Sequence, residues 1–233
     1  MTYTLLARCP VTGAFGIGIA TYSLAVGSKC PAIASNIGAL TTQAFVNPTL
    51  KALALRLLAQ GHPAAQVLEL LGGSDAHFAY RQVALVDRRG NVACHTGAKT
   101  RAWAGHISGD GFVALGNVLE GENVVAAMAK AYTSSTGPDL SERLMRALEA
   151  GRKAGGQRGI DGPLPERSAH ILVHEAEEHP LIDLRVDSHP DAVGEMRRLL
   201  DEFRPYLPFY RQRWLTPHEA VPQDAFVKAL PGR

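Results

Sequence analysis

The order of secondary-structure patterns along the chain predicts an α+β fold in which two antiparallel sheets pack together and helices cover them. Strand patterns occur in neighbouring pairs joined by short turns, and helix patterns also occur in pairs. A doubly wound parallel fold would instead alternate single strands with single helices. The paired order therefore favours antiparallel sheets with helices on their outer faces.

The first half of the chain opens on a hairpin pattern. Phe15, Ile17 and Ile19 alternate with glycine and alanine, so one face of this strand is small enough for another element to pack close to its backbone. Asn47 and Pro48 form a helix-start signal, with Asn47 as the cap of an apolar stripe that ends at a glycine. The expected elements are strands at 4–8, 15–19 and 38–45, an irregular segment at 24–36, helices at 48–60 and 63–71, and a hairpin of strands at 81–87 and 92–96.

The second half continues with two strands, two helices, two more strands and a last helix. Asp139 and Glu142 make a capping box, which predicts a helix start. The segment 151–165 is rich in Gly, Pro and Arg and is expected to be either a mobile loop or a loop that borders a site, and not a domain linker. The expected elements are strands at 102–108 and 112–116, helices at 122–132 and 139–148, strands at 169–173 and 181–186, and a helix at 190–203.

Composition indicates an ordinary globular protein with one main domain. The 233 residues are 46% hydrophobic and 20% charged, which supplies enough apolar mass for one large core. We expect a domain over 1–204 and a Pro- and aromatic-rich tail over 205–233 in an extended conformation. The net charge of +2 gives no reason to expect a nucleic-acid or membrane partner. The aromatic tail and the prevalence of two-fold oligomers favour a homodimer.

The cysteines and the N-terminal segment point to the cytoplasm. Cys9, Cys30 and Cys94 include no Cys-x-x-Cys pair and suit a reducing compartment. The first residues lack the basic and apolar regions of a signal peptide, and no apolar run approaches the roughly 20 residues that cross a bilayer. Zinc-ligand spacing, a dinucleotide fingerprint and a phosphate-binding loop are all missing, so no metal and no cofactor is expected.

Thr2 is the first candidate for chemistry, because removal of Met1 would leave it as an N-terminal residue at the start of a strand. Methionine removal is favoured when the following residue is small, as Thr is. The hydroxyl would then be a nucleophile, and the residue's own α-amine, with an ordinary pKa of about 7.7–8.0, would accept the proton. The alternative is a structural Thr2, since many proteins begin Met-Thr without catalytic consequence.

Five further residues are candidates for a site. Asn117, at the end of a strand, is either an oxyanion donor or a turn residue bonded to local backbone. Thr42 and Gln43 lie on a predicted strand and could bind a substrate in a polar pocket. His106 could act as a base near neutral pH, although a lone histidine is more often structural. Ser23 offers a hydroxyl beside the opening hairpin, without the Gly-x-Ser-x-Gly turn of a serine hydrolase.

Several short motifs are specific as an ordered set. They are Met1–Thr4 with Ala7-Arg8, Leu24–Gly27, Thr42–Ala44 with Asn47-Pro48, Trp103–His106, Gly109–Gly111, Gly116-Asn117 with Leu119 and Gly121, Ala154–Gly156, and Leu184–Asp187. In this order they resemble the bacterial and archaeal family called domain of unknown function 1028, over nearly the whole domain. The resemblance implies the N-terminal nucleophile hydrolase superfamily and its four-layer αββα sandwich, two antiparallel sheets between helix layers.

The resemblance also implies roles for site residues. Members of that superfamily cleave amide bonds with an N-terminal Thr, Ser or Cys, which makes Thr2 the nucleophile and Asn117 an oxyanion donor. The leading hypothesis is an amidohydrolase for a small-molecule amide or N-acyl compound, and the alternative is a non-catalytic binding or structural protein on the same fold. The family's substrate is unknown. This chain departs from the family pattern at Gln157, where an acidic residue is usual, and in a Pro-rich insertion before Glu166.

Overall fold

The computed structural model describes residues 1–137 and 139–230. The chain forms two compact units, Met1–Met196 and Arg197–Arg233. The division into a domain over 1–204 and a tail over 205–233 stays a prediction about domain organisation. Residues 231–233 of that tail lie outside the described residues.

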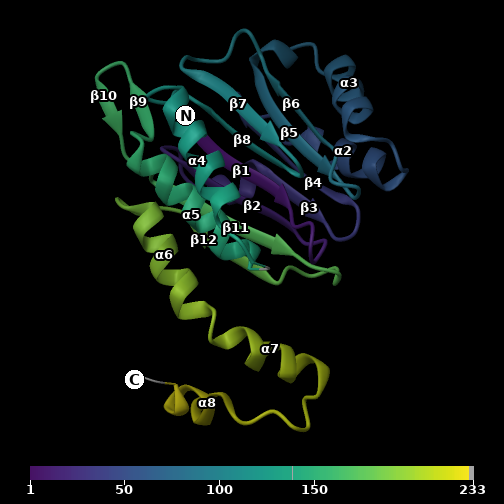
Figure 1. The fold of residues 1–233 in the computed structure, drawn as a ribbon, viewed down its shortest axis with the longest axis vertical. Helices are drawn as coiled ribbons and strands as arrows, with labels where there is room; N and C mark the ends of the chain where they lie inside the picture. The colour runs from purple at the N-terminus through teal and green to yellow at the C-terminus, as the bar shows by residue number, and fades with distance from the viewer. Residues whose placement is uncertain (138, 231–233) are drawn as a thin grey trace. The chain divides into compact units, whose positions relative to one another are not determined.

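The first sheet has six strands in the order β12-β11-β2-β1-β8-β7, and each neighbouring pair is antiparallel. Strand β1 is therefore central, between β2 and β8, as Figure 1 shows. Four of the strands, β1, β2, β8 and β11, are buried along almost their whole length, which agrees with their runs of apolar and small residues. The bounds of the strands in this sheet are β1 (Thr2–Arg8), β2 (Phe15–Thr21), β7 (Ala104–Gly109), β8 (Phe112–Asn117), β11 (Ser168–His174) and β12 (Ile182–Val186).

The second sheet has four antiparallel strands in the order β3-β4-β5-β6. The predicted hairpin of β5 and β6 is confirmed, and its turn uses Gly90 at a φ of +89°, which glycine adopts without strain. A short 3₁₀ helix, η1 (Phe78–Tyr80), leads into β5. The strand bounds are β3 (Pro31–Ala34), β4 (Gly38–Ala44), β5 (Arg81–Asp87) and β6 (Val92–Thr96).

Helices cover the outer faces of both sheets. In Figure 1, α4 (Glu122–Ser134) and α5 (Leu140–Lys153) lie over the first sheet, and α2 (Thr49–Ala59) and α3 (Ala64–Ser74) lie against the second. Strands β1 and β2 contact β4 across the space between the sheets. The predicted mixed α/β fold with antiparallel sheets and outer helices is confirmed.

The two faces of β2 pack in different ways, as its alternating sequence predicts. Phe15 and its alternate neighbours face the apolar core between the sheets. On the opposite face, a Cβ atom placed at Gly16 would lie only 2.7 Å from Leu140 and Leu144 of α5. The close approach of a second element to this strand is therefore confirmed. Asp139 also caps α5, because its carboxylate accepts the Glu142 backbone N–H at 3.0 Å.

Two segments expected to be irregular contain regular structure. The segment 24–36 holds α1 (Val26–Lys29) and β3, and the segment 151–165 holds a hairpin of β9 (Gln157–Gly159) and β10 (Gly162–Leu164). The expectation of plain loops was wrong there because these elements have only three or four residues each. Such short pieces carry little periodicity, and distant partners fix them. For example, the N–H of Val26 donates to the Ser168 hydroxyl at 3.1 Å.

The expectation of an extended tail was also wrong, because most of it is helical. Helix α6 (Ala192–Phe203), which the sequence predicted at 190–203, ends before the tail, and the helices of the tail are α7 (Tyr206–Leu215) and α8 (Gln223–Ala229). Pro205 and Pro222 immediately precede α7 and α8, and Pro208 lies in the first turn of α7. A helix's first turn has no internal acceptor for its N–H groups, so proline is tolerated there. The prolines therefore mark helix starts.

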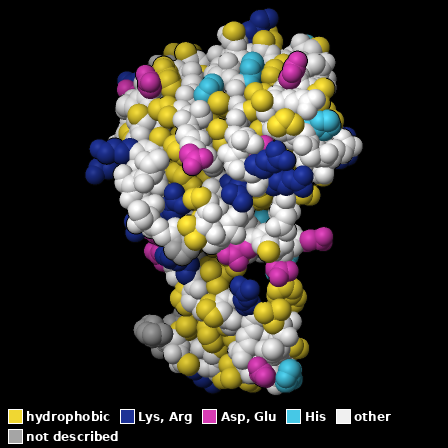
Figure 2. Space-filling view, turned by 45° about the vertical axis from the view of Figure 1, so that its right-hand side comes forward, with side chains coloured by type: hydrophobic (Ala, Val, Ile, Leu, Met, Phe, Trp, Pro, Cys, Tyr) yellow, Lys and Arg dark blue, Asp and Glu magenta, His cyan; other side chains and the backbone are white. Residues whose placement is uncertain are grey.

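The C-terminal unit has its own aromatic cluster, in which the rings of Phe209 and Phe226 stack with centroids 4.1 Å apart. It also exposes large apolar side chains, of the type coloured yellow in Figure 2. They are Tyr210, Trp214, Leu215 and Val221. The homodimer expected from this segment stays a prediction. Among the described helices, none has the length and apolar character needed to cross a membrane.

Candidate functional site

Thr2 lies at the first position of the central strand, between neighbours from distant parts of the chain. The register pairs it with Thr21 at the end of β2 and with Asn117 at the end of β8. All three residues are buried, and the hydroxyl oxygens of Thr2 and Thr21 are 3.1 Å apart. Antiparallel pairing thus gathers three polar side chains at one end of the first sheet.

The Thr2 side chain faces the space between the sheets. Side chains alternate along a strand, so Thr2, Thr4 and Leu6 share one face of β1. Leu6 packs in the apolar core between the sheets, and the Thr4 hydroxyl donates to Gln43 Oε1 on the second sheet at 2.7 Å. The polar side chains therefore form one end of an inter-sheet layer that is otherwise apolar.

Gln82 on β5 is the centre of a buried amide network. Its Nε2 donates to the backbone carbonyls of Gly105 and Gly116, at 3.1 and 2.8 Å, so the other side-chain atom must be the oxygen. That oxygen accepts from Gln43 Nε2 at 2.8 Å and from Asn117 Nδ2 at 3.0 Å. The network therefore orients Asn117 with its Oδ1 free to meet another donor.

The donor that meets Asn117 is the terminal amine. The Met1 amine donates to Asn117 Oδ1 at 2.7 Å. Burial lowers the pKa of this amine from 8.0 to about 6, while Cys30 acts to raise it and Arg101 to lower it. At pH 7 such an amine is mostly neutral and can accept a proton.

The hydroxyl of Thr2 is held by its neighbour Thr21. The Thr21 hydroxyl donates to the carbonyl oxygen of Met1, so it has no hydrogen left to give to Thr2. The Thr2 hydroxyl is consequently the donor of the 3.1 Å contact. The N–H of Ser23 also donates to Thr21 Oγ1, at 3.3 Å, which fixes the acceptor in place.

The structure places Gln43 and Thr42 on opposite faces of β4. Gln43 joins the amide network between the sheets. Thr42 shares its face with Leu40, which packs in the core beneath α2 and α3, and its buried hydroxyl has no hydrogen-bond partner in the described part of the chain. The two were predicted as a pair, and the structure brings Gln43 alone to Thr2.

His106 and Ser23 have looser connections to the cluster. The Thr96 hydroxyl lies 2.9 Å from His106 Nδ1 and accepts from Gln82 Nε2 at 3.0 Å, so His106 reaches the amide network through Thr96. Burial, followed by the charge of His95, lowers the pKa of His106. Ser23 touches the cluster through its backbone N–H, and its side chain is exposed.

Sequence reasoning did not select Thr21 or Gln82. A usable signal for Gln82 was present, since it is a polar residue inside an otherwise apolar strand pattern. Thr21 ends the opening hairpin, and only strand register shows that it lies opposite Thr2. The roles predicted for Thr2 and Asn117 remain proposals.

Two non-glycine residues with positive φ follow directly on residues of the network. Ala44, after Gln43, has a φ of 68°, and Val118, after Asn117, has a φ of 56°. The left-handed region is unfavourable for a β-branched residue such as Val118. Both of its backbone groups are bonded: its N–H donates to the Arg101 carbonyl at 3.3 Å, and its carbonyl accepts from the Arg158 N–H at 3.0 Å. Surrounding segments thus hold the strand end next to Asn117.

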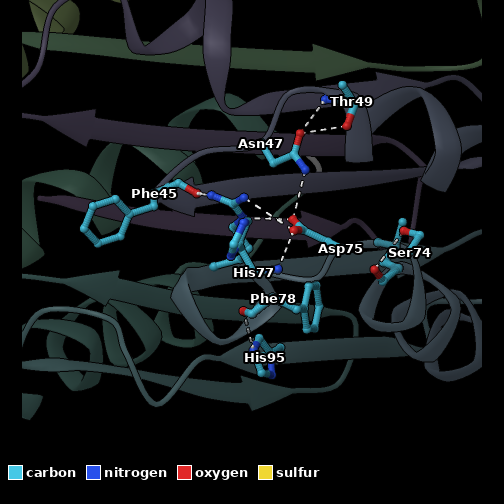
Figure 3. Close-up of polar contacts among 10 residues, drawn as sticks. Phe45, Asn47, Thr49, Ser74, Asp75, His77, Phe78 and His95 are labelled. Atoms are coloured by element: carbon cyan, nitrogen blue, oxygen red, sulfur yellow. Dashed lines mark hydrogen bonds and ion pairs between the residues drawn. The ribbon is translucent and has the colours of Figure 1, made fainter.

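A second polar cluster, shown in Figure 3, holds the end of β4. The Asp75 carboxylate accepts from Asn47 Nδ2 and Arg81 Nε, both at 2.9 Å, and Arg81 also donates to the carbonyl of Phe45 at 2.6 Å. The hydrogen bond from the Arg81 guanidinium is the largest of the causes that hold the pKa of the Asp75 carboxyl far below its usual value. Asn47 Oδ1 accepts the N–H of Thr49, consistent with the predicted capping role. This cluster ties the chain just after Gln43 to the helices behind it.

Asp75→Asn should lower the free energy of unfolding by about 3 kcal/mol at pH 7, because it leaves the charge of Arg81 uncompensated. Both side chains are well buried, at 5% and 14% exposure. Since folding lowers the pKa of Asp75, its contribution is full above the ordinary value of 3.8 and is lost only as pH falls toward the folded value. In urea unfolding, the difference in the free energy of unfolding between the variant and the unsubstituted protein should be constant between pH 5 and 8. It should become smaller in strong acid. Asp224→Asn, in an exposed pair with Lys228, is the control and should change little.

The fold and the site define an antiparallel α/β protein with a buried threonine, amide and amine cluster at the start of its central strand. No group of three or more His, Cys, Asp or Glu within residues 1–137 and 139–230 is placed to hold a metal ion. The family model for DUF1028, a family of unknown function, matches residues 2–196. The chain belongs to this DUF1028 family.

One solved structure belongs to the same family, and two others are more distantly similar to this chain. Protein SPO2555 of Silicibacter pomeroyi, a DUF1028 protein, is 30% identical, with a TM-score of 0.78 over 87% of this chain and 88% of that chain. An Anbu Gly-1 mutant from Hyphomicrobium sp. strain MC1 is 11% identical over 93% and 97% of the two chains, with a TM-score of 0.43. Anbu, an ancestral β-subunit, from Yersinia bercovieri is 12% identical over 99% of each chain, with a TM-score of 0.41. No curated protein matches the chain.

Proposed function

We propose that the protein is an amide-bond hydrolase of the N-terminal nucleophile type, which acts on a small amide or N-acyl compound after Met1 is removed. The observation that carries this proposal is the position of Thr2, a buried hydroxyl at the start of the central strand beside an amine-binding amide. The αββα sandwich implied by the family resemblance is part of the same proposal. The pairs of helices outside two contacting sheets support it.

In the proposed reaction the Thr2 hydroxyl oxygen attacks the carbonyl carbon of the amide, and its proton passes to the α-amine of Thr2. The tetrahedral intermediate collapses when the C–N bond breaks, and the leaving nitrogen takes that proton. The acyl group remains on Thr2 as an ester. A water molecule, deprotonated by the same amine, then attacks the ester and releases the acid and the free hydroxyl.

Asn117 is proposed to have two roles in this reaction, one toward the amine and one toward the oxyanion. Its Oδ1 binds an amine in the structure, so after removal of Met1 it would orient the α-amine of Thr2. One Nδ2 hydrogen is bonded to Gln82, and the second remains to donate to the developing oxyanion, as the resemblance implies. Thr21 would hold the Thr2 hydroxyl in place before attack.

Mass spectrometry of the natively expressed, intact protein tests the first requirement. We expect the main species to lack Met1, leaving Thr2 at the terminus. A protein that retains Met1 throughout would overturn this mechanism. It would favour the second candidate, a binding or structural protein, because the Met1 amine and carbonyl are already bonded by Asn117 and Thr21.

The pH dependence of kcat/KM should show one acidic limb near pH 6. The burial that lowers the pKa of the Met1 amine to about 6 should act similarly on the Thr2 amine that replaces it. The base works only when neutral, so the rate rises with pH through about 6 and levels above it. Thr2→Ser should keep the same limb. A limb near 8 would indicate a solvent-exposed amine and contradict the proposed environment.

A further inference from the structure

We propose that the substrate is an amide that carries a free carboxylate, with Arg101 binding the carboxylate and the side-chain amide of Gln157 donating to a substrate oxygen. This inference rests on the proposed function, because it names the substrate class of the same site. Two independent observations carry it: a buried amide donor that has no partner, and a guanidinium that has no counter-charge.

Gln157 supplies the unpartnered donor. The residue is fully buried, and its Oε1 accepts the backbone N–H of Tyr22 at 2.9 Å, which identifies the other atom as Nε2. That Nε2 has no hydrogen-bond partner in the described part of the chain. An unmet buried donor is unfavourable, because the hydrogen bond that it made to water in the unfolded chain is not replaced. A substrate oxygen bound beside it would remove that cost.

Gln157 also lies at the correct end of the sheet. Tyr22 directly follows Thr21, and Leu119, which bridges to Gln157, lies two residues after Asn117. Thr21 and Asn117 are the two residues paired with Thr2. Gln157 therefore connects the ends of the two strands that flank the nucleophile, through its side chain to Tyr22 and through its backbone to Leu119.

Arg101 lies in the segment before β7 and contacts the chain just after Asn117, at the same end of the sheet. Its carbonyl accepts the N–H of Val118, whose own carbonyl is bonded by Arg158. The Arg101 side chain is exposed, and no ion pair to it is found within residues 1–137 and 139–230. Arg158, by contrast, is paired with Glu120 at 2.8 Å. Of these two arginines beside Val118, Arg101 is the one left to bind a ligand carboxylate.

The electrostatics of the site agree with an anionic ligand. Beyond burial, the groups that shift the pKa of the terminal amine are Cys30 and Arg101, with no carboxylate among them. Burial raises the pKa of the Cys30 thiol to about 12, so it is neutral at pH 7. Arg101 thus brings a positive charge without a matching negative one. A carboxylate on the substrate would supply it, and guanidinium binds carboxylates with two parallel hydrogen bonds.

The test compares matched acids and neutral amides by binding, without turnover. The probes are N-acetyl amino acids and the corresponding N-acetyl amino acid carboxamides, titrated by ligand-observed NMR against the Thr2→Ala protein. We expect the best acid to bind at least tenfold more tightly than its carboxamide. Arg101→Ala should abolish this preference. Gln157→Glu keeps the acceptor for Tyr22 but removes the donor. In the Thr2→Ala protein it should therefore also weaken binding of the acid.

Arg88→Ala is the matched control, because Arg88 is exposed and has no ion pair in the described chain. It comes directly after β5, at the opposite end of that strand from Gln82. The substitution should leave the preference unchanged. Equal binding of acids and carboxamides, an Arg101→Ala protein that keeps the preference, or no binding of either set would overturn the inference. If the preference holds while Met1 is retained, the carboxylate site stands and the proposed hydrolase mechanism fails.

Discussion

Thr2→Ala is expected to lower kcat/KM for amide hydrolysis by on the order of 10³-fold or more, because it removes the nucleophile itself. Alanine is also small, so removal of Met1 should proceed as before and the amine should still form. Thr2→Ser keeps the hydroxyl and should retain measurable turnover. The measurement is release of free amine from a set of N-acyl compounds, with the N-terminus of each variant checked by mass spectrometry.

Thr133→Ala is the control for this substitution. The Thr133 hydroxyl is exposed on α4 and donates to the backbone carbonyl of Ala129, one turn earlier in the same helix. It should leave turnover unchanged. If Thr2→Ala kept full activity while Thr133→Ala behaved as expected, another group would carry the reaction, and His106 would be the next candidate.

Gln82→Leu is expected to lower the free energy of unfolding by about 4 kcal/mol or more. Leucine has a similar volume but leaves five polar groups without this hydrogen-bond partner, and each buried one costs about 1–3 kcal/mol. The buried ones are the carbonyl of Gly116 and the side-chain amides of Gln43 and Asn117, and the partly buried ones are the carbonyl of Gly105 and the hydroxyl of Thr96. Urea unfolding at pH 7 measures the loss.

Two comparisons separate hydrogen bonding from packing at this position. Gln82→Glu keeps the shape but places a carboxylate oxygen against the two carbonyls, so it should also destabilise at pH 7. Gln66→Leu changes an exposed glutamine on α3 and should shift stability by less than about 0.5 kcal/mol. A Gln82→Leu protein as stable as Gln66→Leu would show that the amide network contributes little to stability.

Much of the fold follows from local patterns that a single chain displays. The alternation around Phe15 predicted a strand with one small face, and that face meets α5. The signals at Asn47 and at Asp139 gave helix starts, because caps act within one turn of the backbone. Prolines in the tail were misleading, since proline is disfavoured inside a helix but suits its first turn.

The candidate site also combines features that local sequence predicts with features that it does not. The sequence by itself determined that Thr2 begins a strand and that Asn117 ends one. Only the tertiary structure decided that the two are paired, with Thr21 on the other side and Gln82 reaching across from the second sheet. The physical reason is strand register: Asn117 and the Met1 amine are 116 positions apart yet hydrogen bonded, and no local preference encodes such a pairing. Gln157 likewise became a candidate only when its buried, unmet donor was found between two strand ends.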